Sequence, residues 1–159
     1  MSIPRTDKYK ALNFLCDNRL AVLSTVSPES DMPQSALVYY VVDESFPLFI
    51  VTIKQSRKIK NLLKNQKVSL VIFSEIPPIE LQIEGTAEII EDPHKKNQMS
   101  ERYLEVSNKN PETLNWPPIL KLPNSDGFEF LKVTIDWFKY SDFSEREGSI
   151  VEGTPADWQ

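Results

Sequence analysis

The stretch Glu80-Leu81-Gln82-Ile83-Glu84-Gly85-Thr86-Ala87-Glu88-Ile89 has the clearest pattern in the chain. Apolar side chains alternate with polar ones, which predicts a β-strand with one buried face and one face toward water. Gly85 interrupts this alternation near its middle. A glycine inside a strand marks a bulge, a bend at a barrel corner, or the close approach of another backbone or a ligand. We therefore expect a strand with a special backbone position at residue 85.

Outside this stretch, further segments rich in β-forming residues are separated by clusters of turn residues. Because helices do not alternate with strands as parallel βαβ units require, the sheet should be antiparallel, and sheets of this size commonly close to remove their edges. We predict a mainly β protein of the α+β class, a six-stranded antiparallel β-barrel with peripheral helices. The other predicted strands are 20–26, 34–42, 48–52, 67–73 and 128–140, and the predicted helices are 6–17, 57–65 and 92–106.

The same spacing assigns side chains to faces. Residues 34–42 are apolar on both faces, so both faces should be covered. In the last predicted strand, Trp137 shares a face with Leu131, and Phe138 lies on the other face.

A second informative stretch, Ser56-Arg57-Lys58-Ile59-Lys60-Asn61-Leu62-Leu63, follows a predicted strand. Ser56 is a suitable N-cap, and Ile59, Leu62 and Leu63 would form the buried helix face. Arg57 and Lys58 then lie where the helix dipole disfavours cations unless an anion is also present. Free amides, a hydroxyl and two cations can bind a phosphate, although a solvated basic helix face would have the same sequence.

Composition limits the possible functions. At 159 residues the chain should form one domain over 1–159, with the barrel at about 20–143 and a polar tail at 144–159. Trp158 predicts that the end of this tail docks on the domain. A net charge of −5 argues against nucleic-acid or membrane binding, which needs a basic surface. The sequence has no run of about 20 apolar residues and no signal-peptide pattern, so we expect a soluble cytoplasmic protein.

The chain has one cysteine and one histidine. Cys16 cannot form an internal disulfide, and we expect it to behave as a small apolar residue in the first helix. His94 lies in a polar helix start, where an exposed imidazole is the ordinary outcome. Neither a zinc site nor a nucleophilic triad can be assembled from this set, so we predict no metal site and no catalytic side chain.

Four groups of short motifs stand out between Ala21 and about Phe143. They are Ala21-Val22-Leu23-Ser24-Thr25-Val26 with Pro33-Gln34-Ser35-Ala36, Phe49-Ile50-Val51-Thr52 with Ser56-Arg57-Lys58-Ile59-Lys60-Asn61-Leu62, Ile83-Glu84-Gly85-Thr86-Ala87, and Val133-Thr134-Ile135-Asp136-Trp137-Phe138-Lys139-Tyr140. In these motifs and in the order of its elements, the chain resembles the FMN-binding split-barrel superfamily that includes pyridoxamine 5′-phosphate oxidase, especially its general-stress-protein-like branch. The resemblance implies a split barrel and a homodimer that binds two FMN molecules between its subunits and acts on a small-molecule substrate.

On the phosphate side, the resemblance implies that Ser56, Arg57 and Lys58 hold the FMN phosphate, and that Val51 and Thr52 line the phosphate and ribityl chain. Arg57 offers a planar fork of donors, while Lys58 offers a point charge. Asn61 lies one turn after Arg57. It would either complete the phosphate pocket or occupy a plain position on the helix surface.

On the ring side, the resemblance implies that the backbone of Ser35, Ala36 and Leu37 lies along the flavin, with Gln82 as a further contact. The family's flavin-contacting Gln lies five residues before the strand glycine, where this chain has Glu80. A substrate would stack on the flavin. The aromatic residues that either line its pocket or pack in the core or dimer interface are Tyr39, Tyr40, Trp116 and Trp137.

A second departure concerns the C-terminal region. Pyridoxamine phosphate oxidases carry an Arg-Leu-His-type segment that grips the substrate phosphate, whereas residues 140–147 here are acidic and contain no histidine. We therefore expect an FMN-dependent oxidoreductase that acts on an unidentified small molecule other than a B6 vitamer. The alternative is a non-enzymatic protein on the same barrel that binds flavin, deazaflavin or haem, or has a stress-related role. The proline-rich residues 108–127 should form a functional or interface loop.

Overall fold

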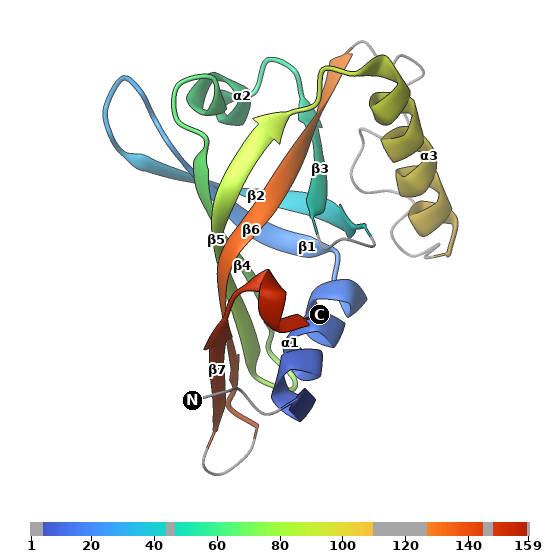
Figure 1. The fold of residues 1–159 in the computed structure, drawn as a ribbon. Coiled ribbons are helices and arrows are strands. Elements are labelled where there is room, and N and C mark those ends of the chain that lie inside the picture. The colour runs from blue at the N-terminus through green and yellow to red at the C-terminus, as the bar shows by residue number, and fades with distance from the viewer. Residues whose placement is uncertain (1–4, 44–46, 110–126, 145–147, 159) are drawn as a thin grey trace.

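The computed structural model describes residues 5–43, 47–109, 127–144 and 148–158. Within them, six antiparallel strands follow one another in the order β3-β2-β1-β4-β5-β6 and close into a barrel by pairing of β3 with β6 (Figure 1). The predicted fold is confirmed, and a further strand, β7, pairs with β6. The elements are α1 (Arg5–Asp17), β1 (Leu20–Val26), β2 (Pro33–Val42), β3 (Leu48–Ile53), α2 (Arg57–Leu62), β4 (Lys67–Ser74), β5 (Ile79–Ile89), α3 (Pro93–Lys109), β6 (Phe128–Asp142), β7 (Ser149–Gly153) and the 3-10 helix η4 (Pro155–Trp158).

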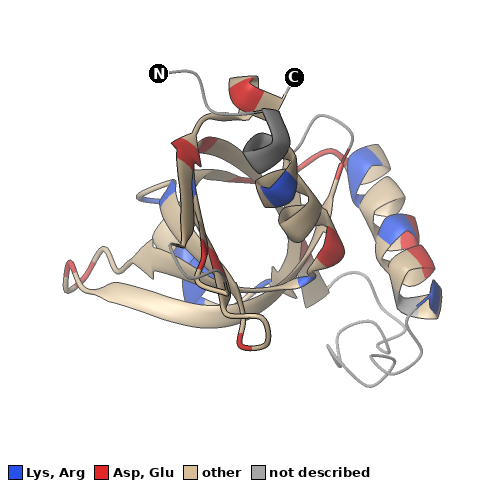
Figure 2. Ribbon diagram, turned by 90° about the horizontal axis from the view of Figure 1, so that it is seen from below, with Lys and Arg blue, Asp and Glu red and all other residues tan. Residues whose placement is uncertain are grey.

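The three α-helices take different places around the barrel. α1 and α2 lie toward opposite ends in Figure 1, and α1 adds Ala11 and Leu15 to the barrel core. α3 stands outside the ring of strands (Figure 2), where Met99 and Tyr103 pack on the outward side chains of β2, β3 and β6. Two cores result, one inside the barrel and one beneath α3. No described helix is long and apolar enough to cross a membrane.

The backbone at Gly85 explains why the alternation along β6 fails. Gly85 pairs with Ile135, while Glu84 pairs with Trp137, so Asp136 is an extra residue in β6. A Cβ at residue 85 would collide with the Thr134 carbonyl oxygen, which makes glycine necessary here. The bulge reverses the faces beyond it. Phe138 is therefore buried and Trp137 only half-buried, which corrects the face assignment from sequence.

The split of the barrel lies between β2 and β3. Their ladder has only three pairs, from Val42 with Leu48 to Tyr40 with Ile50. Beyond the third pair, β2 continues beside β1 as far as Pro33, and β3 continues beside β6 as far as Ile53. The two strands therefore diverge over the half of β2 that contains residues 33–39.

Side-chain burial corrects three further expectations. The outward face of β2 is covered at Val41 but not at Leu37, which is 54% exposed. In α2 the buried residues are Ile59, Asn61 and Leu62, whereas Leu63 is 69% exposed because it caps the C-terminus of a helix of six residues. Cys16 is exposed rather than packed as an apolar residue.

The described parts of the polar tail are built into the fold. Ser149–Gly153 pairs with β6 as β7, a strand that was not among those predicted from the sequence. Trp158 is buried and stacks on Phe138 with ring centroids 4.5 Å apart. Docking of the chain end through Trp158 is thus confirmed. The predicted loop at 108–127, with Trp116, lies almost wholly outside the described residues.

Candidate functional site

The end of β3 delivers two hydroxyl groups to the start of α2. Thr52 is buried, and its Oγ1 lies 3.3 Å from Oγ of Ser56. Ser56 occupies the N-cap position, with extended backbone angles of φ −71° and ψ 155°. Contrary to the expected N-cap interaction, its side chain makes no capping hydrogen bond. The two hydroxyls hydrogen-bond to each other, and Ser56, which is half-buried, lies nearer the surface than the buried Thr52.

Arg57 and Lys58 follow directly, and no described carboxylate lies within ion-pair distance of either. On β6 the carboxylate of Glu129 is already paired with other cations, with Lys96 at 2.8 Å and with Lys54 at 3.8 Å. Desolvation, and then the positive charge of Arg57, lower the pKa of Lys58. Two adjacent cations without an acidic partner form a site that an anion would stabilise.

Asn61 faces inward rather than lying on the helix surface. Its Nδ2 donates to Thr25 Oγ1 at 2.9 Å and to Gln34 Oε1 at 3.1 Å. Because Asn61 is buried, these hydrogen bonds tie α2 to β1 and β2. The structure thus gives its amide a positioning role for the helix that carries Arg57 and Lys58.

The ring-side residues lie on the part of β2 that has separated from β3. The Tyr40 amide donates to the carbonyl of Arg19, the residue just before β1, at 2.9 Å. In a strand, the backbone N–H and C=O groups of successive residues point alternately to the two edges. Because those of Tyr40 point toward β1, those of Ser35 and Leu37 point to the other edge, toward the split. Ser35 Oγ also lies 2.9 Å from Ser24 Oγ on the outer face. Ala36, between Ser35 and Leu37, is half-buried, and its side chain points toward the inside of the barrel.

The sequence has one decisive match. The family model described as pyridoxamine 5′-phosphate oxidase matches residues 7–142. The chain belongs to the pyridoxamine 5′-phosphate oxidase family. A search of curated proteins found no significant match.

Solved structures with the same fold include flavin- and haem-binding proteins. General stress protein 26 from Bacillus anthracis is 24% identical, with a TM-score of 0.64 over 92% of this chain and 98% of the other. A FAD-binding protein from Mesorhizobium loti is 18% identical, with a TM-score of 0.62 over 82% and 90%. A heme binding protein from Mycobacterium smegmatis is 11% identical, with a TM-score of 0.68 over 99% of this chain and 61% of its own.

One predicted contact of this pyridoxamine 5′-phosphate oxidase family member is not assembled within a single chain. Gln82 lies on the outer face of β5, and β1 and β4 separate that strand from β2. Its Nε2 donates to Glu80 Oε2 at 3.1 Å. Glu80, which stands where the family has its flavin-contacting Gln, is therefore hydrogen-bonded to Gln82. Gln82 can meet Ser35–Leu37 only if they come from different copies.

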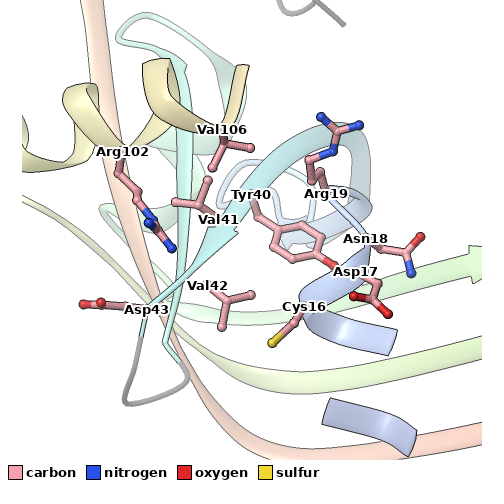
Figure 3. A pocket seen from close by; sticks show the side chains of 10 residues that line it. All are labelled: Cys16, Asp17, Asn18, Arg19, Tyr40, Val41, Val42, Asp43, Arg102 and Val106. Atoms are coloured by element: carbon pink, nitrogen blue, oxygen red, sulfur yellow. The ribbon is translucent and has the colours of Figure 1, made fainter. Parts of the chain in front are cut away.

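Two surface cavities lie near these strands. A cavity of about 380 Å³ contains Leu37 and Tyr39 together with Leu20 and Phe73. A second, of about 510 Å³, lies between the end of α1, β2 and α3 and contains none of the predicted cofactor residues (Figure 3). Tyr40 borders it but is buried, and its hydroxyl donates to the Leu15 carbonyl at 2.8 Å. Among the described residues, no group of three His, Cys, Asp or Glu side chains could hold a metal ion.

Sequence reasoning missed Tyr103. This α3 residue is only 4% exposed, and its hydroxyl reaches the backbone of both strands that form the split. Val51, a predicted site residue, packs in the same core and contributes its amide rather than its side chain. The sequence signal was weak, because a tyrosine four residues after Met99 looks like any member of an apolar helix face.

Proposed function

We propose that this protein binds FMN and uses it as an oxidoreductase acting on a small molecule. The observation that carries the proposal is a pair of cations, Arg57 and Lys58, next to the Thr52 and Ser56 hydroxyls. Among the described residues, neither cation has a carboxylate partner. A phosphate monoester is a dianion with several acceptor oxygens, and this group of donors matches it. The family membership and the FAD-binding relative support a flavin rather than another phosphate.

The chain's own groups have separate parts in this proposal. Arg57 and Lys58 neutralise the phosphate, and Asn61 holds α2 against β1 and β2 so that the cations stay in place. The open edge of β2 at Ser35–Leu37 offers N–H and C=O groups to the polar rim of a flavin ring. A bound flavin supplies the electron-transfer chemistry, so no nucleophilic side chain is required.

We further propose that the site is completed in a homodimer. The outer face of β1, β2 and β4 is covered by no described helix, and Leu20, Leu37 and Phe73 are all exposed there. Exposed apolar side chains that gather on one sheet face are typical of an interface. A second copy on this face would bring its own Gln82 toward the β2 edge, which one chain cannot do.

A flavin carrier without turnover is the second candidate. It is favoured by the C-terminal end of β6, where Asp142 accepts hydrogen bonds from the Ser144 amide and hydroxyl. Those bonds lower the pKa of Asp142, so a carboxylate stands in the region where a substrate-phosphate grip would be cationic. This arrangement disfavours a phosphorylated substrate and leaves the FMN phosphate site unaffected.

The test is the absorption spectrum of the purified protein, followed by titration with FMN, FAD and haem. We expect a flavin spectrum, or saturable binding of FMN with micromolar or tighter affinity. Protein that is colourless and unchanged by added FMN would refute the proposal. Reduction of the bound flavin by NADH or NADPH, with turnover of an acceptor, would separate the oxidoreductase from the carrier.

A further inference from the structure

The hydroxyl of Tyr103 lies between the two strands that separate at the split. It accepts a hydrogen bond from the Val51 amide at 3.2 Å. It also lies within donating distance of two carbonyl oxygens, that of Phe49 at 2.6 Å and that of Tyr39 at 2.9 Å. One buried side chain from α3 therefore contacts the backbone of both β2 and β3.

The register shows what this hydroxyl replaces. The Asp43 amide donates to the Pro47 carbonyl at 3.2 Å, and Val41 pairs with Phe49 two residues further on. In an antiparallel ladder, hydrogen-bonded pairs alternate with non-bonded ones, so the next bonded pair would be Tyr39 with Val51. A direct bond from the Val51 amide to the Tyr39 carbonyl is expected there. The Tyr103 oxygen stands between those two groups instead.

We propose that Tyr103 is a positioning residue of the cofactor site, a wedge that holds β2 and β3 apart at Tyr39 and Val51. This inference rests on the FMN function proposed above. The free edge at Ser35–Leu37 and the hydroxyl of Thr52 lie just beyond the wedge, on the two strands that it separates. Without the wedge, the ladder can add the Tyr39–Val51 pair and narrow the space that the flavin needs.

The surroundings keep the wedge in a single state. Tyr103 packs with Met99 and Phe130 beneath α3, which fixes the ring. Burial raises the pKa of Tyr103 far above the ordinary range of a tyrosine, so its hydroxyl keeps its proton and remains both donor and acceptor. A site whose width is set before the ligand arrives loses less entropy on binding.

The chain offers a matched control. Tyr40 is also buried, and its hydroxyl also binds a backbone carbonyl, that of Leu15, but on the α1 side of β2. Tyr103→Phe and Tyr40→Phe each remove one buried hydroxyl and leave the ring. Both variants should lose similar stability to heat, whereas only Tyr103→Phe should affect the split.

The experiment compares FMN affinity of the wild-type protein and the two variants by fluorescence titration, with amide hydrogen exchange at Val51. We expect Tyr103→Phe to weaken FMN binding about tenfold or more, as loss of one member of a buried network can do. Tyr40→Phe should stay within about twofold of wild type, because the hydroxyl that it removes bonds to the Leu15 carbonyl and to neither edge of the split. The flavin-free wild type should exchange the Val51 amide slowly.

Each result decides between explanations. Equal FMN affinity of Tyr103→Phe and wild type, or an equal loss in both variants, would overturn the wedge and leave the proposed function intact. A wild type that binds no FMN would refute the function and the wedge together. If Tyr103→Phe does not fold, the wild-type exchange still decides, because a Val51 amide that exchanges as fast as that of Ile53 on the same edge rules the wedge out.

Discussion

Val41 and Leu37 lie on the outer face of one strand, β2, four residues apart, yet they have opposite environments. Val41 is 6% exposed because α3 covers it, together with Phe49 and Tyr103. Leu37 is 54% exposed because no described helix reaches it. The alternation of side chains along β2 is the same at both positions. What differs is the covering element, and a pattern of apolar residues does not name that element.

The half of β2 that α3 covers and the half that it leaves open should therefore respond differently to substitution. If the covered half is core, a change there should cost stability whatever the ligand or protein concentration. If the open half and the adjoining start of α2 form a binding surface, a change there should cost a partner or a ligand and leave the fold intact. Three sets of variants test this difference.

The largest effect is expected from Val41→Asp, with Leu37→Asp as its matched partner on the same face. A carboxylate buried beneath α3 without a cation should destabilise the fold by about 5 kcal/mol or more, which is comparable to the whole stability of many domains. Thermal and urea unfolding followed by circular dichroism would measure it. A cooperative unfolding transition close to that of wild type would mean that α3 does not cover Val41 in solution.

Leu37→Asp should leave the unfolding of the isolated subunit within about 0.5 kcal/mol of wild type, since the residue is already exposed. It should instead weaken the proposed dimer by about 2 kcal/mol for each copy, the burial free energy of a leucine. Sedimentation equilibrium over a range of concentrations measures that change. A dimer as stable as the wild-type dimer would place the subunit interface on another face.

The second set concerns the start of α2. Arg57→Ala combined with Lys58→Ala should weaken FMN binding by a few kcal/mol, because two charge-assisted contacts at about 1.5 to 3 kcal/mol each are lost. Lys60→Ala with Lys64→Ala is the control, because it removes the same charge from exposed positions on and just after this helix. Equal losses of FMN affinity in both double variants would mean that the net charge of the protein, rather than a contact from Arg57 or Lys58, causes the loss. An unchanged affinity in the first would mean that the phosphate lies elsewhere.

The smallest effect is a gain. Lys58→Met should stabilise the FMN-free protein by a few tenths of a kcal/mol near pH 7, because it removes a half-buried cation next to Arg57. Since the folded-state pKa of Lys58 is lowered, the charged form is disfavoured in the fold, and wild type regains stability as pH rises through that pKa. The advantage of Lys58→Met should therefore fade at alkaline pH. An advantage independent of pH between 7 and 11 would exclude this electrostatic cause.

Much of the fold could be predicted because local pattern and tertiary environment agree. The alternation in residues 80–89 and the clusters of turn residues predicted the six barrel strands, and the start of α2 after Ser56 was also correct. The order of elements and the short motifs indicated the family, which the match over residues 7–142 establishes. The assignment of individual side chains to the cofactor remains a prediction.

The remaining features depend on contacts between distant segments. Gly85 signalled a special position, but the extra residue is Asp136 in the partner strand, so the reversed faces of Trp137 and Phe138 could not be read from either strand alone. For Asn61 the sequence left a pocket position and a surface position open, because its partners Thr25 and Gln34 lie on other elements. These side chains are specified by what lies opposite them.

The short strand β7 has a consequence for the behaviour of the protein in solution. One edge of β6 pairs with β5, and its other edge is shared by two strands. On that second edge, β3 pairs with Phe128 to Val133, and β7 pairs with Phe138 to Asp142. Without β7, the far end of β6 would present unpaired amides and carbonyls, an open template for strands of other molecules. The tail thus satisfies these groups of β6, and the edge that it leaves is a strand of five residues, short enough to be a poor template. Trp158, stacked on Phe138, holds the end of the tail against the barrel.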